Sequence, residues 1–128
     1  MIENSTLIAL VGATIGKTAL ITFKATTNQN VAGLYPKKLE QINPFYLYFV
    51  SQTLYTNFMR LGDGCFKMAN LSYIKNLEIP LPSLANQKQI VEKIEAERVI
   101  IDANKKLIAV YEQKIRDTIA RLWSDKTD

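Results

Sequence analysis

Histidine is absent from the 128-residue chain, and cysteine occurs once, at Cys65. The chain therefore lacks the commonest general base and metal ligand, and a single thiol can form neither an intrachain disulfide nor a zinc-binding thiolate cluster. We expect no metal, no cofactor and a cytoplasmic compartment, where thiols stay reduced. The chain also lacks an apolar run of about 18 residues and a charged-then-apolar leader, so we expect neither a membrane span nor a secretory signal.

Negative charge is sparse in the first part of the chain. The net charge is +4 overall, and residues 1–83 hold seven cations against four anions. No anion lies between Glu3 and Glu40, a stretch that contains four lysines: Lys17, Lys24, Lys37 and Lys38. Such a surface suits a phosphate backbone, but small soluble domains often carry a similar excess. Charge alone leaves both interpretations open.

Proline and glycine are absent from residues 84–123, where the pattern predicts one long helix with Ser83 as its N-cap. Its length would be roughly 60 Å, so it should extend beyond the globular part of the chain. Apolar residues recur along it at a seven-residue step, and we call this row the isoleucine seam: Ile94, Ile101, Ile108, Ile115 and Leu122. A second helix should cover such a seam.

The positions that accompany the seam are unusually polar, since they include Glu97, Asn104 and Thr118. In a parallel dimer each would face its own copy, and a buried polar residue at such a position lowers stability while fixing register. We therefore expect a homodimer with antiparallel helices. The alternative is a helix that folds back onto its own sheet.

Three short strands are predicted in the first part of the chain, at residues 7–11, 18–23 and 31–35. A fourth is predicted at residues 77–81, where Pro80 would confine it to a sheet edge. Together with the helical segments, these strands predict a mixed α/β fold: a partial sheet with short helices, followed by the long coiled-coil-forming helix.

Two helical segments are predicted between these strands. Asn43 followed by Pro44 is a helix start, and the helix should continue to Gly62. Its aromatic residues are spaced as a buried face, which favours a core over a base-stacking platform. Asn70 is expected to cap one short turn.

The segment from Gly12 to Lys17 invites comparison with a phosphate-binding loop. That loop needs four residues between its glycines and this one has three. The following residues, 18–23, also suit a strand better than the helix that would hold a phosphate. We expect instead a tight turn that lifts Thr14 and Lys17 toward a DNA backbone or base edge. A nucleotide-binding enzyme is the third-ranked alternative.

Several segments in a fixed order carry a family resemblance. They are Gly12-Ala-Thr-Ile-Gly-Lys17, Thr27-Asn28-Gln29, Asn43-Pro44-Phe45-Tyr46-Leu47, and the run from Ile79 to Val91 that leads into the long helix. From about Leu7 to the C-terminus, this pattern resembles the specificity subunit of type I restriction-modification systems. One departure is Asn86, where the family usually has Glu.

The resemblance implies a non-catalytic DNA-specificity module. Residues 1–83 would be the C-terminal portion of a target recognition domain that reads half of a bipartite site on double-stranded DNA. Residues 84–128 would be the spacer and dimerisation helix. Methyltransferase subunits would dock on the module and, through them, the restriction subunit. The resemblance also implies further strands ahead of the point where this chain begins. The rival interpretation is a coiled-coil adaptor with no DNA role.

Seven residues are candidates for DNA contact: Thr14, Lys17, Gln29, Asn30, Arg60, Lys67 and Asn70. The cations would serve as phosphate or guanine donors, and the amides would serve as adenine readers. Asn28 and Gln29 could equally hold their loop together by bonding to the backbone.

Overall fold

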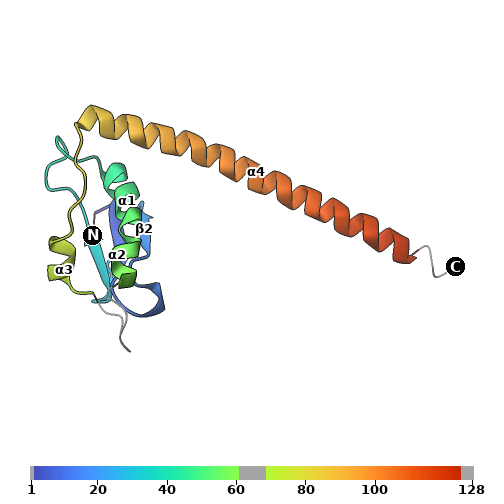
Figure 1. The fold of residues 1–128 in the computed structure, drawn as a ribbon, viewed down its shortest axis with the longest axis horizontal. Helices are drawn as coiled ribbons and strands as arrows, with labels where there is room; N and C mark the ends of the chain where they lie inside the picture. Colours follow the sequence, from blue (N-terminus) through green and yellow to red (C-terminus); the bar gives the residue numbers. More distant parts are fainter. Residues whose placement is uncertain (1, 61–68, 125–128) are drawn as a thin grey trace. The chain divides into compact units, whose positions relative to one another are not determined.

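The computed structural model describes residues 2–60 and 69–124. The chain divides between Val91 and Glu92 into two compact units. The first contains a small sheet with its covering helices, and the second is the remainder of the long C-terminal helix (Figure 1). The mixed α/β fold predicted from the sequence is confirmed.

The sheet has three antiparallel strands, β1 (Ser5–Ala9), β2 (Thr18–Ile21) and β3 (Val31–Leu34), in the order β2-β1-β3. Ile8 of the central strand lies opposite Thr18 on one side and Ala32 on the other. All three strands were predicted from the sequence, although β1 begins and ends two residues earlier than expected. Both β2 and β3 are edge strands within the described residues, since each pairs only with β1.

One face of the sheet is covered by helices. Ile8 is fully buried on this face, and α1 packs across β1 and β2 (Figure 1). The buried residues of this core are Ile8, Leu10, Ile15, Ala32, Leu54, Phe58 and Ala69. The core is therefore built from residues of the strands, of the turn after β1 and of the helical region.

Helix α1 (Pro44–Thr53) begins at the predicted position. The Asn43 side chain accepts hydrogen bonds from the backbone N–H groups of Phe45, at 2.8 Å, and Tyr46, at 3.3 Å. It thereby satisfies two of the donors that a helix start leaves unpaired. Pro44 occupies the first turn, where its missing N–H costs nothing.

The single helix expected up to Gly62 is wrong, because the chain forms two helices that break at Leu54. The Leu54 N–H donates to the Ser51 carbonyl at 3.2 Å, a tighter turn that ends α1. Helix α2 (Tyr55–Arg60) then follows. The break carries no Pro or Gly. It lies where Leu54 and Phe58 both pack into the core.

The aromatic residues of these helices are mainly core residues, as predicted. Tyr46, Phe49 and Phe58 are buried, while Tyr48 and Tyr55 are half-buried. Phe45, at the start of α1, is exposed.

Helix α3 (Leu71–Lys75) has the cap predicted for it. The Asn70 side chain accepts from the Tyr73 N–H at 2.8 Å. The Tyr73 ring then packs edge-on against Phe58, with ring centroids 5.4 Å apart. A helix this short is marginal alone, so the cap and this aromatic contact hold it in place.

The strand predicted at residues 77–81 does not form, which corrects the sequence-based expectation. Leu77 and Ile79 pack against the core without joining the sheet. The Pro80 carbonyl accepts from the Tyr46 hydroxyl at 2.8 Å, and prolines cannot donate to a strand ladder. Burial raises the pKa of the Tyr46 phenol, which keeps this donor protonated.

Helix α4 (Leu84–Ser124) matches the predicted extent within one residue at its C-terminal end. Ser83 caps it, because its hydroxyl accepts from the Asn86 N–H at 3.3 Å. None of the helices among the described residues is both long and apolar enough to cross a membrane.

The first turn of α4 is fixed to the globular unit by Gln87, which is 0% exposed. Its side-chain oxygen accepts from the Asn43 N–H at 2.9 Å. Its side-chain nitrogen donates to the carbonyls of Gln41 and Pro82, both at 2.8 Å. One amide therefore satisfies three backbone groups from two distant parts of the chain.

Replacing this amide should destabilise the fold. We expect Gln87→Ala to lower the free energy of unfolding by at least about 2 kcal/mol, since each buried backbone group left unpaired costs about 1–3 kcal/mol. Urea titration followed by circular dichroism measures the change. The matched control is Gln89→Ala, on the same helix but exposed, which should stay within about 0.5 kcal/mol of the parent. Equal effects of the two variants would contradict the role given to Gln87.

Candidate nucleic-acid interface

The segment from Gly12 to Lys17 closes the hairpin between β1 and β2. The Ala9 N–H donates to the Lys17 carbonyl at 3.0 Å, and the Gly16 N–H donates back to the Ala9 carbonyl at 2.9 Å. Between them the chain makes one turn of 3-10 helix, η1 (Gly12–Thr14). The loop is therefore pinned at its base by the sheet itself.

Backbone donors of this loop are used inside it. The Ile15 N–H donates to the Gly12 carbonyl at 3.1 Å, and the Lys17 N–H donates to the Thr14 carbonyl at 3.0 Å. A phosphate-binding loop needs such donors directed at the ligand, with a helix following. Here β2 follows instead. The sequence-based expectation that a strand, and not a helix, follows this loop is confirmed.

Two buried residues aim the loop outward. Ile15 is buried in the core, and Gly16 adopts a positive φ of 76° against the Phe58 side chain. With these residues held inside, Thr14 and Lys17 are both exposed. This is the arrangement expected from the sequence.

Three predicted contact residues come together at the end of the sheet where β1 ends and β3 begins. Gln29, Asn30 and Asn70 line one cavity of about 530 Å³, which we call the sheet-end cavity. Its other lining residues are Leu10, Val11, Ala69, Leu71 and Ser72. The Ala69 N–H donates to the Leu10 carbonyl at 2.7 Å, which fixes the two walls to each other.

Hydrogen bonds hold the backbone around this cavity in place. The Asn28 side chain accepts from the Asn30 N–H at 3.0 Å, and the Asn30 carbonyl accepts from the Leu10 N–H at 2.9 Å. Asn28 therefore holds the loop, as one of the sequence-based alternatives proposed. The side-chain oxygen of Asn70 is used by the Tyr73 N–H, so Asn70 can offer a ligand mainly its amide nitrogen.

Lys17 lies in a separate open hollow of about 530 Å³. Gln52 and Tyr55 line it too, together with Gly16 and Thr18. Sequence analysis did not assign Gln52 or Tyr55 to this site. The sequence pattern of a helix indicates which residues face the core, but it does not show which loop lies next to the others.

The remaining candidates are not gathered with these groups. Thr14 lies in η1, and Arg60 is exposed at the end of α2; neither is among the described residues lining the two cavities. Lys67 lies outside the described residues.

The isoleucine seam lies largely open on α4. Ile101, Ile108, Ile115 and Leu122 are 50%, 58%, 60% and 63% exposed, and Ile94 is half-buried. Polar groups on the helix instead bond locally, for example Arg98 to Glu95 at 3.6 Å. Over the residues that the structure describes, the seam is thus a largely exposed apolar face.

These side chains offer hydrogen-bonding groups and a positive charge. The sheet-end cavity presents amides and a hydroxyl, and Lys17 adds a cation. Over the residues that the structure describes, no three His, Cys, Asp or Glu side chains gather in a way that could hold a metal ion.

Comparison with known proteins identifies the class. Residues 1–113 match the family model of the type I restriction modification DNA specificity domain. The chain belongs to this family. It is also similar to a protein of Methanocaldococcus jannaschii named as a type I restriction enzyme MjaX specificity subunit, with 24% identity over 107 residues. That match covers 83% of this chain and 25% of the relative, so the chain spans about a quarter of the relative's length.

The two loop glycines allow a matched test of the loop geometry. Gly16→Ala should destabilise the fold by about 2–4 kcal/mol, because its new Cβ would lie 2.6 Å from the Phe58 Cβ and its φ is positive. Gly12→Ala shares the positive φ but meets nothing within 4 Å, so it should cost only about 1–2 kcal/mol. Thermal or urea unfolding measures both. If Gly12→Ala proves the more harmful, the packing of the loop on Phe58 is wrong.

Proposed function

We propose that this chain is the DNA-specificity module of a type I restriction-modification complex and recognises half of a bipartite site. Residues 1–83 would read the DNA, and residues 84–128 would form the spacer helix that docks methyltransferase subunits. Methyl transfer and cleavage would belong to the methyltransferase and restriction subunits, so the chain itself is non-catalytic. The observation that carries the proposal is the gathering of Gln29, Asn30 and Asn70 in one cavity in a member of a DNA-specificity family.

The roles of the individual groups follow from their chemistry. An amide side chain can pair with adenine through a donor and an acceptor, which suits Gln29 and Asn30 at the open sheet end. A lysine contributes mainly through phosphate, without sequence information. Lys17 is exposed on a rigidly pinned loop, so it can fix the register in which the amides meet the bases.

The Lys17 contact predicts a specific change in salt dependence. In the complex with its methyltransferase, Lys17→Ala should weaken binding of every duplex sequence alike and flatten the slope of log K against log salt by about one. Fluorescence anisotropy over a series of KCl concentrations measures this slope. The matched control is Lys88→Ala, an exposed lysine in the first turns of α4, which should leave the slope unchanged.

Gln29→Ala should behave differently in the same titrations. It should weaken binding to the preferred DNA sequence by about 1–3 kcal/mol and relax the preference at one base pair. The slope of log K against log salt should not change. Identical slopes for Lys17→Ala, Lys88→Ala and the parent would favour the coiled-coil adaptor with no DNA role. Micromolar ATP binding that Lys17→Ala abolishes would instead favour a nucleotide enzyme.

The exposed isoleucine seam supports a second part of the proposal, a homodimer with antiparallel α4 helices. Fully burying such a side chain is worth about 1.5–3 kcal/mol, and four seam residues are at least half exposed. Antiparallel pairing would let Glu97 and Asn104 face residues other than their own copies, which avoids a run of buried like pairs.

A charge placed in the seam should break this dimer. We expect Ile101→Glu or Ile108→Glu to raise the dimer dissociation constant at least a hundredfold, about 2.7 kcal/mol. Val99→Glu is the matched control, because at 3.6 residues per turn it lies about 160° around the helix from Ile101 and is 68% exposed. Light scattering at micromolar concentration reports the mass. A monomeric parent chain would contradict the proposed dimer, and so would a Val99→Glu variant that disrupts it as much as Ile101→Glu does.

A further inference from the structure

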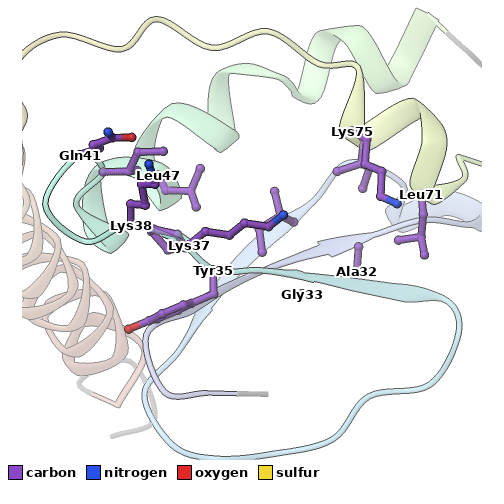
Figure 2. A pocket seen from close by; sticks show the side chains of 13 residues that line it. Ala32, Gly33, Tyr35, Lys37, Lys38, Gln41, Leu47, Leu71 and Lys75 are labelled. Carbon is purple, nitrogen blue, oxygen red and sulfur yellow. The ribbon is translucent and has the colours of Figure 1, made fainter.

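A groove of about 600 Å³ runs beside the outer strand β3. It shares Leu71 with the sheet-end cavity, but none of the residues assigned to DNA lines it. We call it the β3 groove. Its apolar residues include Ala32, Leu34, Leu47, Leu71 and Ile74. Three lysines also line it, at positions 37, 38 and 75 (Figure 2). The groove therefore combines an apolar floor with a cationic rim.

Among the residues that the structure describes, no strand pairs with the side of β3 that faces away from β1, and the backbone groups on this side suit another strand. The Leu10 N–H donates to the Asn30 carbonyl, so in the antiparallel register Ala32 and Leu34 direct their backbone groups at β1. Gly33, and Tyr35 beyond it, then direct theirs away from β1. Gly33 is also exposed and has no side chain to obstruct an approaching backbone.

The charges of the groove specify the occupant further. Lys37, Lys38 and Lys75 are exposed, and none is in an ion pair with another described residue. No carboxylate is among the residues that line the groove. In Figure 2 the Lys37 side chain runs along β3, while Lys75 reaches from α3 toward the strand. An acidic partner would meet positive charge at both ends.

We propose that the β3 groove binds an extended acidic segment of a partner protein, which adds to β3 as a fourth strand. Its alternate apolar side chains lie on Leu34, Leu47 and Ile74, and its carboxylates meet Lys37 and Lys75. A nucleic-acid backbone is the less suitable occupant. It would leave the apolar floor unused and cannot reproduce the alternating donors and acceptors of a strand.

The test uses the full chain, isotopically labelled for NMR, and a blocked hexapeptide of alternating glutamate and valine. The peptide should shift the amide signals of Gly33 and Tyr35. Two control peptides should bind roughly tenfold more weakly or worse: one with lysine in place of glutamate, which reverses the charge, and one methylated on its backbone nitrogens, which removes the strand donors.

Two protein variants separate charge from strand pairing. Lys37→Glu combined with Lys75→Glu should weaken the glutamate peptide at least tenfold and strengthen the lysine peptide, whereas Lys24→Glu combined with Lys88→Glu should do neither. Gly33→Pro removes a donor on the free side, where an edge strand tolerates proline, and should abolish the shifts at Tyr35. Gly33→Ala keeps the donor and should bind.

Three results would overturn the proposal. The first is equal binding of the glutamate and lysine peptides. The second is a set of shifted amides outside the groove. The third is a short random duplex that shifts Gly33 and Tyr35 when the glutamate peptide does not, which would make the groove a nucleic-acid surface.

Discussion

The buried side chain of Gln87 is the interaction on which the arrangement of the first unit depends. It joins the cap of α1, the loop before it and the extended segment before α4 through three hydrogen bonds of 2.8–2.9 Å. The chemistry requires an amide, since a carboxylate cannot donate and an apolar residue would leave three backbone groups unpaired. Asn43 contributes two kinds of hydrogen bond: its side chain caps α1, and its backbone N–H donates to Gln87.

Because this link lies at one end of the sheet, it leaves the other end available for the proposed DNA contacts. The Gln87 partners follow β3 in the chain, whereas the Gly12–Lys17 loop, Gln29 and Asn30 connect the strands at the opposite end. The recognition loops are in turn fixed by their own bonds to β1. Mobile loops would lose entropy on ordering at a DNA surface, and pinned ones avoid much of this cost.

Local signals predicted most of the fold. The caps at Asn43, Asn70 and Ser83 and the uninterrupted pattern of α4 depend on residues close in sequence, and all four were confirmed. Features that depend on distant partners were missed. The break at Leu54 lies where Leu54 and Phe58 pack into the core. Residues 77–81 lie outside the sheet, where Leu77 and Ile79 pack on the core and the Pro80 carbonyl accepts from Tyr46.

The candidate site shows the same limit of sequence reasoning. Polar residues in loops could be chosen by type, but which of them meet depends on the strand order β2-β1-β3. That order places Asn30 next to Leu10, and through Leu10 next to Ala69 and Asn70. Nor could sequence alone distinguish Gln87 from the nearby Gln89, since both are glutamines in a polar stretch and only one is buried.

Helix α3 connects the two proposed recognition surfaces of the first unit. Asn70 at its start lines the sheet-end cavity, Lys75 at its end lines the β3 groove, and Leu71 lines both. A five-residue helix has too few internal hydrogen bonds to be stable by itself, so its position follows its packing on both sides. A strand seated in the groove would press on Leu71 and Ile74 and so restrict the position of Asn70. The sheet-end cavity and the β3 groove therefore share one short helix as a common wall.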